Sequence, residues 1–238
     1  MAPSNSDVVV IFGVGSNIGT ALAKGFVNAG YSVATVSRSS PPSADSSSSS
    51  NPLHIQADLS DPAAVTGVFD KVKSAGLEFP SVVIWNAAAL TPPPDPENPL
   101  SIADSDLDRD LNIMIKSPYV AAREAVKVWQ GRATKDERKG TFIMTGNLLP
   151  KSIPPVAFYT SLGIGKSGAN YWVGTADGVL KSKGIRFFFA DERSRDGGPV
   201  GKTPDGESHA AVYLNLVEGK EDLPHYVTFV EGKYHSFD

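Results

Sequence analysis

The sequence contains no cysteine, which excludes disulfides, thiolate catalysis and zinc–sulfur sites. It also lacks an apolar run approaching the roughly 18 residues of a membrane span, and it does not begin with the basic and apolar regions of a signal peptide. A positive net charge is missing too, because the formal charge is −4. Nucleic acid and anionic membranes are therefore disfavoured partners. Because neither a signal peptide nor a membrane span is indicated, we expect a cytoplasmic protein. The four histidines show no metal-ligand spacing, so we expect no metal site.

Strand-like and helix-like segments alternate along the chain. Short β-branched runs such as residues 8–12 predict buried parallel strands, and helical patterns follow them. This alternation predicts an α/β fold, a Rossmann-like doubly wound parallel sheet with helices on both faces. Residues 1–238 are expected to form a single domain, since 41% of them are hydrophobic and no linker divides them. Residues 39–52, rich in serine and proline, predict a mobile surface loop, and residues 191–210 predict a variable substrate loop.

Local signals place several helix boundaries. Asp61 and Pro62 are typical of a helix start, and Gly30 is typical of a helix end. Residues 104–131 predict a long helix interrupted or bent near Pro118. Residues 156–184 predict a helix weakened by glycines.

A glycine-spaced turn follows the first predicted strand. The stretch "GVGSNIG" lies between a strand and a helix. Such a turn lets the backbone approach a pyrophosphate, while the helix N-terminus offers free N–H groups. Because the strand–turn–helix context is present, we interpret the turn as a dinucleotide site rather than a tight turn without a ligand. The residues predicted to bind the cofactor here are Gly13, Gly15, Ser16, Asn17, Ile18 and Gly19.

The second predicted strand ends in "VSRSS", where the adenosine ribose is expected. An NAD-dependent dehydrogenase usually has an acidic residue there. Arg38 instead matches a 2′-phosphate by its charge and planar donor fork. Ser37 and Arg38 therefore favour NADP (NADPH) as the cofactor.

Further motifs, taken in order, resemble the short-chain dehydrogenase/reductase family over nearly the whole chain. Besides the glycine turn, "ADLSDP", "WNAAA", "DLNIMIKSPYVAAREA", "GTFIMTG" and the segment beginning "GKSGANYW" stand at family-like separations. The resemblance implies a reductase that holds the adenine and nicotinamide halves of its cofactor at defined positions. These implied cofactor residues are Asp58, Leu59, Asn86, Ala87, Ala88 and Lys166.

The same resemblance implies a catalytic set in which one motif is disturbed. In the family, a tyrosine four residues before the lysine exchanges the substrate proton, a serine positions the carbonyl, and an asparagine supports a water relay. Leu162 stands four residues before Lys166, and "TG" stands where two serines are frequent. Asn112 and Thr145 are the implied asparagine and hydroxyl residue.

Tyr159 is a candidate replacement for the missing tyrosine. Seven residues before Lys166, it would lie about 10 Å away along a regular helix, so a direct cluster would not form. The glycines before Lys166 predict an irregular segment that would bring Tyr159 closer. The alternative is a packed aromatic residue beside Phe158. Asp191 and Glu192 offer another carboxylic acid near the pocket, or they serve as helix caps or solvated loop residues.

Three functions remain open from the sequence. The first is an NADP-dependent reductase of a carbonyl or imine in a small, fairly apolar molecule, carried by Asn112, Thr145, Tyr159 and Lys166. The second is a reductase-derived scaffold that accelerates a non-redox cyclisation or isomerisation by positioning. The third is a non-catalytic NADP-binding protein. The resemblance also implies a homodimer or homotetramer. Its interface would be formed by the helix that contains "AREAVKVW" and by the helix after Lys166.

Overall fold

The strands of this computed structural model, which describes residues 7–39, 52–132, 139–201 and 203–237, form one sheet. Its strand order is β3-β2-β1-β4-β5-β6-β7-β8. All neighbouring strands are parallel except β7 and β8. The predicted doubly wound parallel sheet is therefore confirmed. The strands are β1 (Val8–Phe12), β2 (Ser32–Ser37), β3 (Leu53–Gln56), β4 (Val82–Trp85), β5 (Gly140–Thr145), β6 (Ile185–Glu192), β7 (Tyr226–Val230) and β8 (Lys233–Tyr234).

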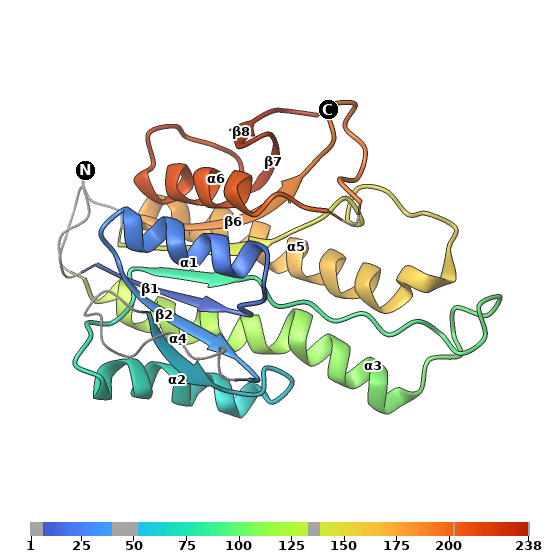
Figure 1. Ribbon diagram of the computed structural model, residues 1–238, viewed down its shortest axis with the longest axis horizontal. Helices are drawn as coiled ribbons and strands as arrows, with labels where there is room; N and C mark the ends of the chain where they lie inside the picture. Colours follow the sequence, from blue (N-terminus) through green and yellow to red (C-terminus); the bar gives the residue numbers. More distant parts are fainter. Residues whose placement is uncertain (1–6, 40–51, 133–138, 202, 238) are drawn as a thin grey trace.

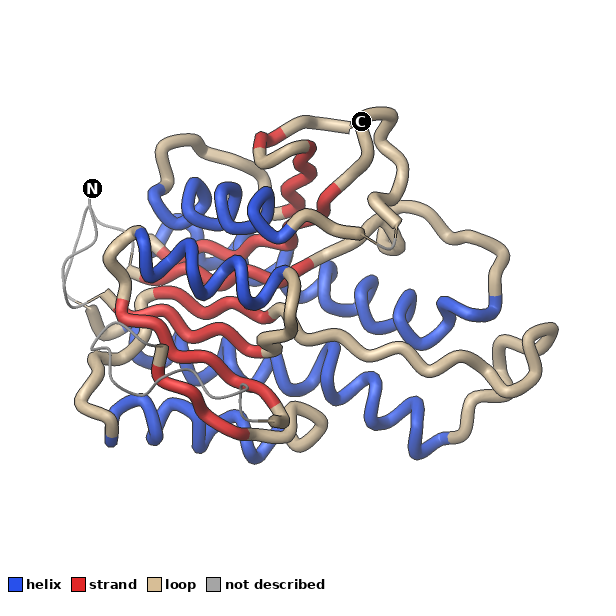
Figure 2. Tube along the Cα trace, in the orientation of Figure 1, coloured by secondary structure: helices blue, strands red, loops and turns tan. Residues whose placement is uncertain are grey.

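Helices cover both faces of this sheet (Figures 1 and 2). Residues of α2, α4 and α5 share one apolar core with one face, and residues of α1 and α6 share a second core with the other. No helix among the described residues is long and apolar enough to cross a bilayer. The helices are α1 (Ile18–Asn28), α2 (Pro62–Ser74), α3 (Asp104–Leu111), α4 (Ser117–Gln130), α5 (Thr160–Leu180) and α6 (Gly206–Glu218), with the π-helix η1 (Asn112–Lys116) and the short 3₁₀ helices η2 (Ala157–Tyr159) and η3 (Lys181–Lys183).

The local helix signals hold in the structure. Asp61 caps α2 by accepting a hydrogen bond from the Ala63 N–H, and Pro62 is the first helical residue. Gly30 follows the end of α1 with a φ of 91°, a conformation that favours glycine. The predicted mobile segment 39–52 lies, except for its two end residues, outside the described residues.

The long helix expected over residues 104–131 is interrupted near Pro118, as predicted, just before the proline. The interruption is η1, where the Ser117 N–H reaches the Asn112 carbonyl, five residues back. Pro118 is in the first turn of α4, where its missing N–H leaves no intrahelical bond unmade. Trp85 of β4 holds the widened turn by donating its Nε1–H to the Ile113 carbonyl at 3.0 Å.

The predicted substrate loop of residues 191–210 is wrong at both ends. Asp191 and Glu192 complete β6, and α6 begins at Gly206. Asp205 caps that helix by accepting a hydrogen bond from the Glu207 N–H. The loop therefore covers residues 193–205 only.

The connection from β6 to β7 has the uncommon hand. The chain moves in the same direction across the sheet from β5 to β6 and from β6 to β7, yet α5 and α6 lie on opposite faces. Nearly all such crossovers are right-handed, but two crossovers in the same direction with helices on opposite faces cannot have the same hand. Helix α5 lies on the same face as α4 and its crossover runs in the same direction, so the β6–β7 crossover is the one that is not right-handed. Residues 193–205 must therefore cross the carboxyl edge of the sheet to reach the other face.

Candidate functional site

The glycine turn between β1 and α1 lies at the carboxyl edge of the sheet. Gly13 has a φ of +90°, and a Cβ there would lie 2.4 Å from the Ala87 backbone nitrogen. A Cβ at Gly19 would lie 2.6 Å from the Val14 Cα. At Gly15, by contrast, a Cβ would meet nothing within 4 Å, and Gly15, Ser16 and Asn17 are exposed. The turn is thus tight where it meets the protein and open at its tip.

Two neighbouring segments fix this turn from the sides. Asn86, which directly follows β4, donates its Nδ2–H to the Gly13 carbonyl at 2.8 Å. Asn17 donates its Nδ2–H to the Pro204 carbonyl at 2.8 Å, which ties the crossing loop 193–205 to the turn. Ala87 is half-buried and Ala88 is exposed beside them. The structure therefore brings the predicted residues of the first and fourth strands together.

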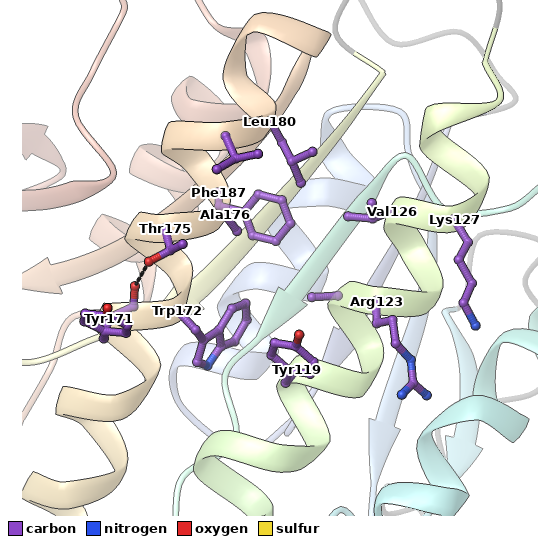
Figure 3. A pocket seen from close by; sticks show the side chains of 12 residues that line it. Tyr119, Arg123, Val126, Lys127, Tyr171, Trp172, Thr175, Ala176, Leu180 and Phe187 are labelled. Carbon is purple, nitrogen blue, oxygen red and sulfur yellow. Dashed lines mark hydrogen bonds between the residues drawn. The ribbon is translucent and has the colours of Figure 1, made fainter.

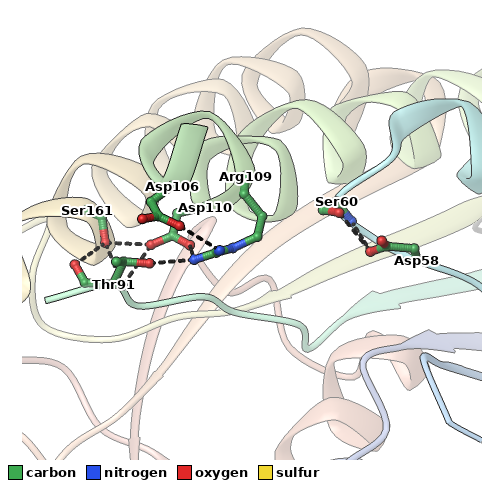
Figure 4. Close-up of polar contacts among 7 residues, drawn as sticks. All are labelled: Asp58, Ser60, Thr91, Asp106, Arg109, Asp110 and Ser161. Atoms are coloured by element: carbon green, nitrogen blue, oxygen red, sulfur yellow. Dashed lines mark hydrogen bonds and ion pairs between the residues drawn. The ribbon is translucent and has the colours of Figure 1, made fainter. Parts of the chain in front are cut away.

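The end of β2 carries the residues expected at the adenosine. Arg38 is exposed, and its carbonyl accepts a hydrogen bond from Gln56. The Ser60 backbone N–H, and then the Ser60 hydroxyl, donate to Asp58 and lower the pKa of that carboxyl; the charge of Arg38 adds to this (Figure 4). Leu59 is buried. Asp58 is therefore ionised, and it lies close enough to Arg38 for the charge of that residue to act on it.

Lys166 is a buried cation on α5. Only 3% of it is exposed, and its Nζ donates to the Thr145 carbonyl at 2.6 Å. Burial lowers the pKa of Lys166 to about 8, while the charge of Asp191 raises it. A lysine placed in this way is close to its titration point near neutrality.

The hydroxyl of Thr145 does not meet Lys166. Ile143 belongs to the core on the α6 side, and side chains alternate along a strand, so Thr145 also faces α6. Its hydroxyl donates to Asn86 Oδ1 at 2.9 Å and accepts from the Tyr213 hydroxyl at 2.8 Å. Gly146 occupies the α5 side without a side chain. The backbone carbonyl of Thr145 reaches Lys166, whereas its side chain is directed away.

Tyr159 is not brought next to Lys166 by an irregular segment. α5 is continuous from Thr160 through the lysine, so the interpretation of a glycine-loosened segment is wrong. Two of the glycines serve packing instead, since a Cβ at Gly165 would lie 2.5 Å from Met114 and one at Gly168 would lie 2.8 Å from Ile115. Tyr159 precedes the helix, is 40% exposed and contacts the Phe158 ring edge-on.

These close contacts bring η1 against the lysine-bearing part of α5. Asn112, half-buried, begins η1, and Met114 of the same turn packs on Gly165, the residue before Lys166. Leu162 lies one helical turn before Lys166 and is half-buried. Asn112 and Lys166 thus lie on facing elements, with Leu162 at the position where the motif would have a tyrosine.

Asp191 and Glu192 are both buried, which excludes the interpretation of solvated loop residues. Asp191 follows Phe189 on the α5 side of β6, and Glu192 faces α6. Glu192 accepts hydrogen bonds from the Asp205 N–H, and its Oε2 lies 3.6 Å from His209 Nδ1. Burial raises the pKa of Glu192 to about 6 and lowers that of His209.

A polar brace joins the loop after β4 to α3 and α5 (Figure 4). The carboxylate of Asp110, fully buried, accepts from the Thr91 N–H and from the Ser161 hydroxyl, each at 2.8 Å. Arg109 donates to the Thr91 hydroxyl at 2.7 Å. Ser161 immediately precedes Leu162, so the brace fixes the start of α5 above the site. None of these residues was predicted from the sequence to serve the site.

A groove of about 470 Å³ lies elsewhere, between α4 and α5 (Figure 3). Tyr119 of α4 and Trp172 of α5 point toward each other there, with ring centroids 5.7 Å apart. Arg123 and Tyr171 also line the groove. None of the residues predicted to bind cofactor or substrate lines it. Its apolar lining suits packing against another surface better than it suits the expected chemistry.

The residues at the carboxyl edge fit a dinucleotide. The exposed tip of the turn leaves room at Gly15 for a diphosphate at the start of α1. Arg38 follows the end of β2, and Lys166 reaches the end of β5 through the Thr145 carbonyl. Each is a cation that can donate hydrogen bonds to the phosphate or hydroxyl oxygens of a nucleotide.

Comparisons with known proteins agree with this arrangement. The model of the short chain dehydrogenase family matches residues 7–189. The chain is 36% identical to the short chain dehydrogenase/reductase dmxR12 of Cryptosporiopsis sp. (strain 8999), over 96% of this chain and 93% of that protein.

Solved structures share the fold at low sequence identity. The NADH-dependent reductase A1-R′ responsible for alginate metabolism superposes with a TM-score of 0.79 at 16% identity, covering 95% of this chain and 96% of that one. The NADPH-dependent 3-quinuclidinone reductase of Rhodotorula rubra gives a TM-score of 0.75 at 18% identity, covering 94% and 89%. The sequence match and the architecture together establish that this chain belongs to the short-chain dehydrogenase/reductase family.

Proposed function

We propose that this chain is an NADP(H)-dependent oxidoreductase that reduces a carbonyl or imine group of a small, fairly apolar molecule. Membership of the family supports an oxidoreductase. The observation that carries the proposal is the buried Lys166, whose Nζ is fixed at the end of β5. That position lies at the same sheet edge as the glycine turn.

The cofactor preference rests on Arg38. Of the two solved structures above, one is an NADH-dependent reductase and the other is an NADPH-dependent reductase. The fold alone therefore does not decide between the two cofactors. Arg38 is exposed at the end of β2, where a guanidinium suits a 2′-phosphate. Ser37 adds a hydroxyl next to it, and the turn from Gly13 to Gly19 would hold the diphosphate.

The substrate is proposed to bind above the carboxyl ends of β4 and β5. The loops that follow these strands extend together beyond the sheet, on the right of Figure 1. They expose large apolar side chains: Leu90 is 37% exposed, Val156 49% and Phe158 45%. Such a lining favours an apolar molecule with few charges. When bound, the cofactor supplies the hydride, and Lys166 is the residue that can hold or release a proton at its Nζ.

An assay of NADPH oxidation tests the proposal directly. Purified chain is mixed with NADPH and a panel of ketones, aldehydes and cyclic imines, from apolar to charged. We expect turnover with apolar members and loss of turnover with Lys166→Met. Saturable binding of NADPH without oxidation by any member would contradict the reductase function.

A second candidate follows from Leu162. The residue one turn before Lys166 has no proton to donate, and Tyr159 lies outside α5. A scaffold of this kind would hold a polyfunctional molecule in a productive shape and accelerate a cyclisation or isomerisation without hydride transfer. Conversion of such a molecule at an unchanged NADPH concentration would favour this candidate.

The groove between α4 and α5 is proposed to be covered by a second copy of this chain. Its rim exposes large side chains: Tyr119 is 53% exposed, Tyr171 77% and Val179 60%. A two-fold axis would place the same patch of each copy against the other. Light scattering should give a dimer or tetramer, and Val179→Arg should give monomers. A monomeric wild type would contradict this assembly.

A further inference from the structure

A chain of hydrogen bonds leads from helix α6 to the glycine turn. Tyr213 of α6 donates its hydroxyl to Thr145 Oγ1 at 2.8 Å, and Thr145 donates its own hydroxyl to Asn86 Oδ1 at 2.9 Å. Asn86 then donates its Nδ2–H to the Gly13 carbonyl at 2.8 Å. The chain therefore links α6, the end of β5, the end of β4 and the first residue of the turn.

These side chains lie on the face of the sheet that α1 and α6 cover. Tyr213 belongs to the core on that side. Trp85 belongs to the core on the other side, so the next residue, Asn86, is directed toward α6, as its bond to Thr145 requires. Tyr213 is 0% exposed and Thr145 is 8% exposed. Water therefore cannot readily replace these partners, and a break in the chain would leave buried polar groups unpaired.

The direction of the chain is set at its Tyr213 end. Burial raises the pKa of the Tyr213 phenol, so the hydroxyl keeps its proton and donates it to Thr145. A threonine hydroxyl has a single proton, and Thr145 directs it at Asn86 Oδ1. The Asn86 amide is thereby held with its oxygen toward Thr145 and its nitrogen toward Gly13.

Asn86 completes a set of bonds that fix the start of the turn. The Gly13 N–H and the Val14 N–H both donate to the Val36 carbonyl, at 2.9 and 3.2 Å. The Asn86 side chain binds the Gly13 carbonyl from the other side. Both polar groups of the Gly13 backbone are therefore held, so the open tip at Gly15 begins from a fixed direction.

We propose that Tyr213 and Thr145 are positioning residues for the cofactor turn, acting through Asn86 on the carbonyl of Gly13. This assigns the Thr145 hydroxyl to the cofactor side of the site, in place of the catalytic role expected from the sequence. Neither hydroxyl touches a nucleotide or a substrate in this role. The inference rests on the proposed function in one respect, namely that the turn holds the diphosphate of NADP(H).

The test measures NADPH affinity by fluorescence titration of the full-length chain carrying Thr145→Val or Tyr213→Phe. Valine keeps the backbone carbonyl that accepts from Lys166, and phenylalanine keeps the buried ring. We expect the dissociation constant to rise about 3- to 10-fold in each variant, the range of one net hydrogen bond. The double variant should add little to the larger single effect, because both changes break the same chain. An unchanged affinity in either single variant would overturn the proposal.

Two control variants separate positioning from a general loss of packing. Thr145→Ser keeps the hydroxyl and should restore the wild-type affinity. Thr228→Val removes another buried threonine hydroxyl, which belongs to β7 and donates to the His235 carbonyl. It should lower the Tm and leave the NADPH affinity unchanged. A loss of affinity in Thr228→Val as large as that in Thr145→Val would overturn the proposal.

Amide hydrogen exchange in the cofactor-free chain separates this inference from the proposed function. The Gly13 and Val14 N–H groups should exchange faster in Tyr213→Phe than in the wild type, while exchange in α2 stays the same. Faster exchange at the turn without NADPH binding to the wild type would refute the proposed function and leave the positioning chain intact. Unchanged exchange at the turn would refute the inference, whether or not NADPH binds. Should Thr145→Val fail to fold, Tyr213→Phe decides both measurements.

Discussion

Leu162 and Lys166 lie one turn apart on the same face of α5, and the leucine side chain has no group that can exchange a proton. The lysine is nevertheless buried and fixed by a hydrogen bond of 2.6 Å to the Thr145 carbonyl. The site thus contains a buried cation with no phenol one helical turn before it.

Leu162→Tyr should increase carbonyl reduction. A phenol at this position would lie one turn from Lys166, whose charge would lower the phenol pKa toward neutrality. We expect at least a 10-fold gain in kcat for NADPH-dependent reduction, a modest part of the roughly 10²–10⁴-fold range of general acid catalysis. Leu162→Phe is the matched control, because it adds the ring without the hydroxyl. Equal rates for the two variants would show that the hydroxyl does not reach the reacting group.

Arg38→Ala should weaken NADPH binding far more than NADH binding. A charge-assisted hydrogen bond to a phosphate contributes about 1.5–3 kcal/mol, so we expect a loss of roughly 10- to 100-fold in NADPH affinity. Fluorescence titration with both nucleotides measures the difference. Lys24→Ala, on the polar side of α1, controls for general loss of positive charge. Equal losses for both nucleotides would exclude Arg38 from the 2′-phosphate.

Gly13→Ala and Gly15→Ala should separate the folding role of the turn from its binding role. The first variant combines a positive φ with a Cβ 2.4 Å from the Ala87 backbone, so we expect a large loss of stability, about 2 kcal/mol or more. The second meets no atom within 4 Å, so the free energy of unfolding should change by less than about 1 kcal/mol. NADPH affinity should fall in Gly15→Ala all the same, because the added methyl occupies the space proposed for the diphosphate. Unchanged affinity there would argue against a nucleotide at this tip.

Glu192→Gln should stabilise the chain above pH 6. Burial raises the pKa of Glu192 from 4.5 to about 6 in the folded chain. Between these values the folded state binds more protons than the unfolded state, so stability falls as pH rises and the cost is complete above about pH 6. The neutral glutamine removes this cost and can still accept from the Asp205 N–H. Thermal unfolding should give a higher Tm for the variant at pH 7.5 and little difference at pH 4. A difference of the same size at both pH values would contradict the titration of Glu192.

The sequence predicted those features that depend on local patterns. Gly13 and Lys166 could be located because a strand–turn–helix motif and the "GKSGANYW" segment are contiguous, and the structure places both at the carboxyl edge. The orientation of Thr145 could not be predicted from the motif, because the alternation along β5 decides which face its hydroxyl takes. The full burial of Asp191 at the end of β6 depends on how the sheet packs, which the sequence does not display.

Helix α6 was missed for a different reason. The predicted substrate loop extended over its first five residues, 206–210, which are polar or small and follow a glycine-rich segment. The signals that would have found it are Asp205, which caps the helix, and Gly219, which ends it with a φ of 64°. The uncommon hand of the β6–β7 crossover has no local signal.

The most direct test of the account is a calorimetric titration of NADPH into the wild type and into Lys166→Met. The account predicts saturable binding at one site per chain, and at least a 10-fold weaker affinity in Lys166→Met, since about 1.4 kcal/mol corresponds to a factor of 10. Absence of NADPH and NADH binding to folded wild-type chain would contradict the assignment of this edge of the sheet to a dinucleotide.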